Sequence, residues 1–172
     1  PSGPTIIRGG TVLTMDRTLG EIAAGDVLIE DGRIAAVGPR LAAGDAAVID
    51  ATGMIVLPGF VDTHAHMWPF WGLHKEQPWM YLANLAYGVT TTRDPQTGTN
   101  DTFVYEDMVE TGEILGPRVY STGPGIFNTS GLDDLNTTRA FVKRYKETYH
   151  TNTVKQYMVG DRKVRQWVIM AT

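Results

Sequence analysis

Cysteine is absent from the 172-residue sequence. Its absence excludes disulfide bonds, thiolate nucleophiles and cysteine zinc sites, so any metal ion must be held by His, Asp, Glu or a modified residue. The sequence also lacks an apolar run that approaches the roughly 20 residues needed to cross a bilayer. Residues 1–30 have neither the basic start nor the apolar middle of a signal peptide. The sequence therefore gives no reason to expect a membrane protein.

Charge is also sparse, with a formal net charge of −4 and no basic stripe. This pattern argues against nucleic acid or an anionic membrane as a partner. A hydrophobic content of 42% is enough to build a core, and the length suits one domain or one and a part. Without a signal segment a cytoplasmic location is favoured. Because the chain begins at Pro1 rather than Met, a periplasmic or secreted location stays open if a signal was removed.

Residues 1–57 read as a small β domain. Its clearest signal is Asp31-Gly32 between two apolar runs, because both turn positions of such a hairpin favour positive φ. The predicted strands cover residues 5–7, 11–14, 26–30, 33–37, 47–50 and 54–56. This part carries no convergent polar cluster, so we expect it to be a sheet packed beside something larger.

Residues 58–172 change to an alternation of strands and helices. Strands are predicted at residues 59–64, 89–93, 118–122 and 153–158, and helices at residues 77–87, 101–115, 133–148 and 161–172. The strands begin at intervals of about 30 residues, the size of a βαβ unit. Four such units fit an open parallel sheet or half of an eight-unit barrel. Because the sequence stops within an apolar helix, we expect a fragment of a longer chain.

Two histidines end the first of these strands, in Leu57-Pro58-Gly59-Phe60-Val61-Asp62-Thr63-His64-Ala65-His66. Residues i and i+2 of a strand point to the same side, so His64 and His66 can aim two imidazoles at one point. Neutral imidazole is the commonest side-chain metal ligand. Two polar residues at a strand end are the alternative. The position where an apolar run stops, however, is where a parallel barrel places its chemistry.

Two further charged residues lie at predicted strand ends. Lys155 can reach water from the strand end, pair with Asp94 or another acid, or be carboxylated into an anionic ligand that bridges two metals. Asp94 can line a substrate pocket or cap the turn that follows its strand. The sequence leaves these alternatives open.

Aromatic residues are concentrated after the histidines, with three of the four tryptophans within twelve residues. They can pack a loop and helix against the barrel, or form an apolar wall over a metal site. Trp68, Trp71 and Tyr157 are the aromatic candidates for a substrate pocket.

Several motifs together resemble the N-terminal part of the metal-dependent amidohydrolase superfamily. They are Asp31-Gly32-Arg33-Ile34 through Gly38, Asp50-Ala51-Thr52-Gly53, Leu57 to His66, and Gly88-Val89-Thr90-Thr91 with Arg93-Asp94. Residues 84–91, 116–124 and 155–157 look like the amidohydrolases that are fused to a TolB-like propeller. The resemblance extends from about Ile6 to Thr172.

This resemblance implies the N-terminal half of a (β/α)8 TIM-type barrel, preceded by part of a composite β-sandwich. It implies that His64 and His66 ligate the more buried of one or two divalent metal ions, with zinc expected, and that Lys155 is the carboxylated bridging lysine. Two further histidines and the general-base aspartate would lie beyond Thr172, so the fragment alone should be inactive.

The activity that the resemblance implies is hydrolysis of a C–N bond in an amide, cyclic amide or dipeptide-like compound. A mononuclear deaminase of the same barrel type and a non-catalytic homologue are the alternatives. The expected partners are a small-molecule substrate and the rest of the barrel, and a homo-oligomer is also open.

Overall fold

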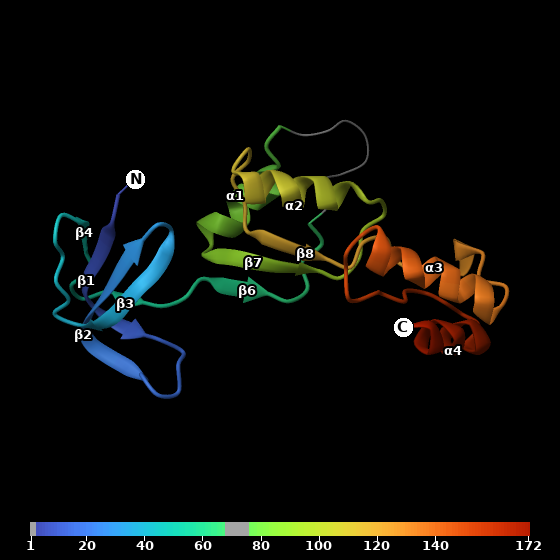
Figure 1. Ribbon diagram of the computed structural model, residues 1–172, viewed down its shortest axis with the longest axis horizontal. Helices are drawn as coiled ribbons and strands as arrows, with labels where there is room; N and C mark the ends of the chain where they lie inside the picture. The colour runs from blue at the N-terminus through green and yellow to red at the C-terminus, as the bar shows by residue number, and fades with distance from the viewer. Residues whose placement is uncertain (1–2, 68–75) are drawn as a thin grey trace. The chain divides into compact units, whose positions relative to one another are not determined.

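The computed structural model describes residues 3–67 and 76–172, which form a mixed α/β structure as the sequence predicts. The chain divides into two compact units, Pro1–Pro58 and Gly59–Thr172. The first unit contains only strands, and the second alternates strands with helices (Figure 1).

The first unit is a five-stranded sheet in the order β3-β2-β1-β4, with β5 also paired to β1. Its strands are β1 (Thr5–Leu13), β2 (Glu21–Glu30), β3 (Arg33–Pro39), β4 (Ala47–Asp50) and β5 (Ile55–Val56). The two separate strands predicted within residues 5–14 are a single strand, β1. Gly9 takes a φ of +79° within β1, and the pairing with β2 shifts register between Ile7 and Gly10. Gly9 and Gly10 therefore mark a bulge within one strand and not a break between two strands.

The predicted hairpin is confirmed. Asp31 and Gly32 have φ values of +49° and +71°, and they connect the antiparallel strands β2 and β3. Both residues occupy the left-handed region, which Gly adopts freely and Asp tolerates.

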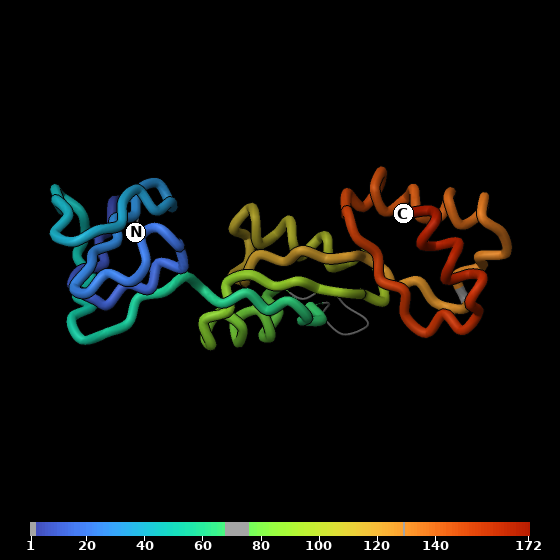
Figure 2. Tube along the Cα trace, turned by 90° about the horizontal axis from the view of Figure 1, so that it is seen from below, coloured from blue at the N-terminus to red at the C-terminus, as the bar shows by residue number. Residues whose placement is uncertain are grey.

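The second unit is organised by a three-stranded parallel sheet in the order β6-β7-β8. The strands are β6 (Phe60–Asp62), β7 (Val89–Asp94) and β8 (Arg118–Ser121), and they run side by side in Figure 2. Helices α1 (Trp79–Ala86) and α2 (Asp101–Thr111) cover one face (Figure 1). A core lies between sheet and helices, formed by Met67, Tyr81, Tyr105, Ile114 and Val119.

The ends of α1 and α2 differ from the prediction for identifiable reasons. Gln77 lies before α1, because its side chain accepts a hydrogen bond from Leu115 N (2.9 Å) and donates one to Leu115 O (2.8 Å). Gly112 ends α2 in the left-handed conformation, with a φ of +79°. A left-handed glycine is a common end of a helix, so α2 stops four residues before the predicted Leu115.

A second core forms around α3 (Leu135–Glu147), α4 (Arg162–Ala171) and the short 3-10 helix η1 (Asn128–Ser130). Asp134 caps α3 by accepting from Thr137 N at 2.8 Å. Asp161 caps α4 by accepting from Lys163 N at 2.6 Å. Among residues 3–67 and 76–172, no helix combines the length and apolar character needed to cross a membrane.

The predicted fourth strand at residues 153–158 is wrong as a strand of this sheet. Its pairing is an isolated parallel bridge between Gln156 and Ile126, with hydrogen bonds from Ile126 N to Lys155 O (2.8 Å) and from Tyr157 N to Ile126 O (2.9 Å). Nearer β8, the Thr151 hydroxyl donates to Ser121 O at 2.9 Å. The Thr151 side chain thus occupies Ser121 O, a backbone acceptor that a neighbouring strand would otherwise use. The segment at residues 153–158 therefore pairs with Ile126, beyond the end of β8.

Gly59, just before β6, lies unusually close to β7. A Cβ atom there would be 2.1 Å from Thr90 Oγ1 and 2.7 Å from Thr90 Cβ. We predict that Gly59→Ala lowers the free energy of unfolding by about 1–3 kcal/mol, as overpacking does. Gly38→Ala is the matched control, because its Cβ would meet only Leu41 at 3.7 Å. Thermal melts should separate the two variants, and equal melting temperatures would contradict the prediction.

Candidate functional site

The two histidines follow β6 rather than lying on it, so the prediction that they share one strand is wrong. β6 ends at Asp62, whose carboxylate accepts the backbone N–H of His64 at 2.9 Å. Ala65 N donates to Arg93 O at 3.1 Å, which holds the segment beside β7. The rings of His64 and His66 still lie together, with centroids 5.6 Å apart and an interplanar angle of 81°. The turn closed by Asp62 and the hydrogen bond from Ala65 N to Arg93 O thus bring the two imidazole rings together.

His66 is oriented by a backbone carbonyl. Its Nδ1 lies 2.8 Å from Gln96 O, and because a carbonyl only accepts, Nδ1 carries the proton in this hydrogen bond. The neutral ring then presents the lone pair of Nε2. Metal-ligating histidines commonly use their other nitrogen in this way. The side chain of His66 is 46% exposed, so its orientation and its access both suit a metal ligand.

Asp94 lies behind His66 at the end of β7. Its side chain is fully buried, and Oδ1 accepts from Gln96 N at 3.0 Å and lies 3.7 Å from His66 Nδ1. Burial raises the pKa of Asp94 to about 6, although hydrogen bonds from the Gln96 and Met67 N–H groups and the charges of His66 and Arg93 oppose the rise. This geometry is that of an acid capping the turn after its strand.

Four buried oxygen atoms beneath α1 and α2 have no hydrogen-bond partner among the described residues. They are Tyr81 Oη, Asp94 Oδ2, Thr102 Oγ1 and Glu106 Oε2. Burial and the charges of Asp94 and Glu106 raise the pKa of Tyr81. The two acids and the phenol therefore share one poorly solvated region, in which a negative charge is costly.

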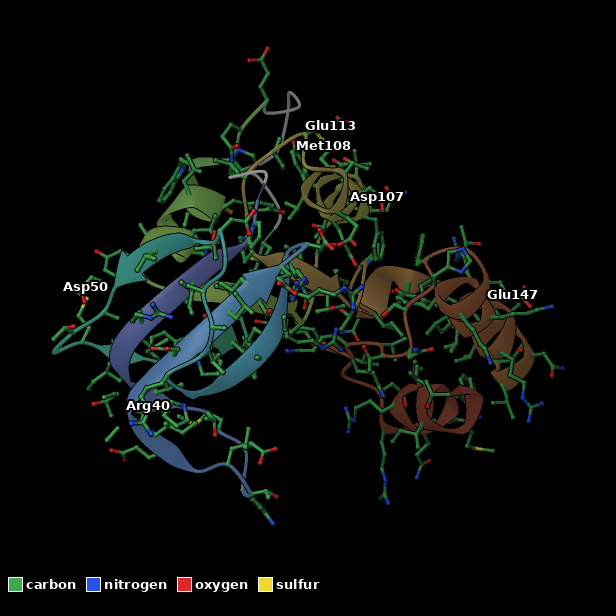
Figure 3. The ribbon with its side chains drawn as sticks, turned by 60° about the vertical axis from the view of Figure 1, so that its left-hand side comes forward. Arg40, Asp50, Asp107, Met108, Glu113 and Glu147 are labelled. Carbon is green, nitrogen blue, oxygen red and sulfur yellow. The ribbon has the colours of Figure 1, made fainter. Side chains whose placement is uncertain are left out.

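Glu106 is the acid of α2 that faces this region. Its pKa is raised to about 7, first by burial and then by the charge of Asp107, while a backbone hydrogen bond from Ser121 opposes the rise. Asp107 itself lies on the exposed side of α2 (Figure 3). Sequence reasoning missed Glu106. Its position could have indicated a role, because Glu106 lies one helical turn after the buried Thr102 and next to the buried Tyr105 on α2.

Lys155 and Tyr157 lie together on the segment that pairs with Ile126. Lys155 Nζ is 5.7 Å from the centre of the Tyr157 ring, and that ring meets Phe127 edge to face at 6.0 Å. Tyr157 is 46% exposed and Lys155 is partly buried. The structure therefore pairs these two predicted site residues with each other.

The predicted site residues do not form one complete cluster. In the part of the chain that the structure describes, no group of three or more His, Asp or Glu side chains is arranged to hold a metal ion. The predicted pocket residues Trp68 and Trp71 lie outside the described residues. Of the neighbouring aromatics, Tyr81 is completely buried in the core, and Trp79 is exposed on α1.

A cavity of about 600 Å³ lies near β8, α2 and the segment after α3, and neither His64 nor His66 lines it. Its lining contains Arg93, Glu106, Tyr120, Tyr149 and His150. Ligand sites usually lie in cavities, but here the candidate metal ligands His64 and His66 do not line the cavity. The candidate functional site is therefore the pair of His64 and His66, because a backbone carbonyl orients the His66 ring and the His64 ring lies beside it.

No family model matches the chain, but individual proteins do. The sequence is 50% identical over 64 residues to a dihydroorotase of Solibacter usitatus, a match that covers 37% of this chain and 14% of that protein. It is 40% identical over 134 residues to a D-hydantoinase of Geobacillus stearothermophilus, covering 76% and 28%. It is 48% identical over 61 residues to a 5'-deoxyadenosine deaminase of Methanosarcina mazei, covering 36% and 14%.

The fold also has relatives among solved structures. A prolidase-like protein of Bifidobacterium longum superimposes with a TM-score of 0.71 at 24% identity, covering 93% of this chain and 42% of that one. At this identity the likeness shows the fold alone. The chain spans 14–28% of the length of the curated relatives above. Sequence and structure together confirm the predicted family: the chain belongs to the metal-dependent amidohydrolase superfamily.

The partly buried Glu106 predicts a dependence of stability on pH. The folded pKa of about 7 exceeds the ordinary glutamate pKa of 4.5, so between these values the unfolded chain ionises while the folded chain holds its proton. The free energy of unfolding contributed by this group therefore falls as pH rises from about 4.5 to 7, and the loss persists above pH 7. Glu106→Gln should remove this fall, as measured by chemical denaturation across that range.

The matched control is Glu113→Gln, because Glu113 is exposed just after α2 and its charge is not among those that raise the pKa of Glu106. This control should keep the slope of the unsubstituted protein. Asp94, with its pKa raised from 3.8 to about 6, should leave a residual fall at lower pH in every variant. Parallel curves for Glu106→Gln and the unsubstituted protein would contradict the role of Glu106.

Proposed function

We propose that the protein is a metal-dependent hydrolase of C–N bonds in amides, cyclic amides or dipeptide-like compounds. The observation that carries this proposal is His66, whose Nδ1 is held by the Gln96 carbonyl and whose ring has the His64 ring beside it. The relatives named dihydroorotase and D-hydantoinase support the same reaction class. Because the chain spans a minor part of these relatives, the activity of the whole protein belongs to the proposal.

His64 and His66 would hold one or two divalent ions, with zinc expected. Their donor chemistry fits, because two imidazoles lie together and one already has its other nitrogen engaged by a carbonyl. A bound divalent metal would supply Lewis acidity and would lower the pKa of a coordinated water. The remaining ligands and the general-base aspartate would come from residues outside this chain.

Lys155 would complete the centre in carboxylated form. Its backbone is tied to Ile126, in the segment that follows β8 as the histidines follow β6, and Tyr157 beside it would line the substrate pocket. Asp94, Trp68 and Trp71 remain proposed pocket residues. We further propose that β6, β7, β8 and the Lys155 segment belong to a (β/α)8 barrel, and that residues 1–57 contribute to a composite sandwich.

The proposed partners are a small-molecule substrate and the rest of the barrel, with assembly into a homo-oligomer as an additional proposal. No nucleic-acid partner is proposed, because no basic stripe occurs in the sequence. A cytoplasmic location remains the favoured proposal.

A mononuclear deaminase is the second candidate function. Two observations favour it: the relative named 5'-deoxyadenosine deaminase, and the placement of the Lys155 ammonium over the Tyr157 ring at 5.7 Å. A cation over an aromatic face is stabilised only while it keeps its charge, so this arrangement suits an uncarboxylated lysine.

Replacing both histidines tests the metal site. His64→Ala/His66→Ala in the full-length protein should abolish metal loading, measured by elemental analysis of protein purified in zinc-containing medium. His150→Ala is the control, because His150 is exposed and lies outside the pair. Stoichiometric zinc in the double variant would refute the ligand assignment.

Replacing Lys155 separates the two candidate reactions. If Lys155 bridges two metals, Lys155→Ala should reduce the metal content from two ions to one and abolish C–N hydrolysis. If the protein is a mononuclear deaminase, the metal content should not change. Lys163→Ala is a matched control, because the Lys163 ammonium also lies over an aromatic ring, that of Trp167, at 5.0 Å.

A further inference from the structure

We propose that Gly125 is a positioning residue: the space left by its missing side chain admits the Gln96 side chain, so that the backbone carbonyl of residue 96 can orient His66. The inference rests on the proposed metal centre, because it explains how one of the ligands is fixed. It concerns residues that contact neither a substrate nor a metal through their side chains.

The backbone of Gln96 makes two contacts that define the site. Its N–H donates to the buried carboxylate of Asp94 at 3.0 Å, and its carbonyl meets His66 Nδ1 at 2.8 Å. Asp94 is completely buried, so it anchors this peptide to the core. Any displacement of residue 96 therefore changes the direction in which His66 presents Nε2.

The loop that carries Gln96 is tied to the extension of β8. The Thr122 hydroxyl donates to Pro95 O at 2.7 Å. Thr97 N donates to Gly123 O at 3.1 Å, and Gly125 N donates to Thr97 O at 3.2 Å. Contacts on both sides of Gln96 thus bind its loop to residues 122–125, and the two segments cannot move independently.

Gly125 is required by a contact and not by its backbone conformation. A Cβ atom at this position would lie 2.7 Å from Gln96 Cγ, 2.8 Å from Gln96 Cδ and 3.0 Å from Phe127 Cε2. Its φ does not fall in the left-handed region that favours glycine. An alanine would therefore be tolerated by the backbone and would act mainly by pushing on the Gln96 side chain.

The same short segment also supports the lysine side of the proposed centre. Ile126, next to Gly125, donates its N–H to Lys155 O at 2.8 Å and accepts from Tyr157 N at 2.9 Å. The close approach of Gln96 to Gly125 therefore lies between the segment that supports His66 and the segment that supports Lys155.

The test uses three variants of the full-length protein. Gly125→Ala should weaken zinc binding about 10-fold or more, as loss of an outer contact to a metal ligand does. Gln96→Ala keeps both backbone contacts of residue 96, so its affinity should stay close to that of the unsubstituted protein. The double variant Gln96→Ala/Gly125→Ala removes the clash with Cγ and Cδ and should recover most of the affinity. Competition with a chromophoric chelator measures each value.

A second readout does not depend on metal. In the metal-free protein, the His66 Nδ1–H proton should give an NMR signal protected by its hydrogen bond to Gln96 O. This signal should shift or disappear in Gly125→Ala and return in the double variant. Gly160→Ala is the control, because its Cβ would meet only Asn128 at 3.5 Å, and it should change neither readout.

The outcomes separate this proposal from the proposed function. Unchanged zinc affinity and an unchanged His66 signal in Gly125→Ala would overturn the positioning role, as would a double variant that recovers neither. If Gly125→Ala does not fold, the double variant must be more stable than the single one, and equal instability would overturn the proposal. If the unsubstituted protein binds no zinc, the proposed function fails, and the His66 signal still tests the contact.

Discussion

The pairing of β7 with both of its neighbours is the constraint on which the candidate site depends. On one side, Ala65 N meets Arg93 O at 3.1 Å, just before His66. On the other side, Thr122 N meets Asp94 O at 2.9 Å, at the start of the segment that leads to Gly125. Parallel pairing brings the carboxyl ends of strands to one edge, and here it places residues from three segments within reach of one another.

Much of the architecture follows from signals that act over a few residues. Asp31-Gly32 identifies a hairpin because few dipeptides tolerate two positive φ values. Asp134 and Asp161 cap helices near the predicted starts, because a carboxylate satisfies N–H groups that lack partners within a helix. The histidine pair can also be picked out from the sequence, because His64 and His66 follow an apolar run, where a parallel barrel places its chemistry.

The sequence predicts the candidate site less well, because its geometry depends on contacts between distant residues. The histidines lie together although β6 has ended, through an Asp62 turn that strand periodicity does not reveal. Gln96 acts through its backbone, so its residue type carries no signal. The Lys155 segment looks like a strand, but whether it joins a ladder depends on which groups occupy the edge of β8, where the Thr151 hydroxyl already binds Ser121 O.

Arg93 connects parts of the chain that are far apart in sequence. Its guanidinium donates to Tyr120 O at 3.1 Å and also to the hydroxyl of Thr153, sixty residues away. Closing so long a loop costs more entropy than pairing neighbouring strands. Pairing β7 with β8 closes a much shorter loop than joining Arg93 to Thr153 does. The contacts between the parallel strands therefore cost less chain entropy than the contact that reaches the segment before Lys155.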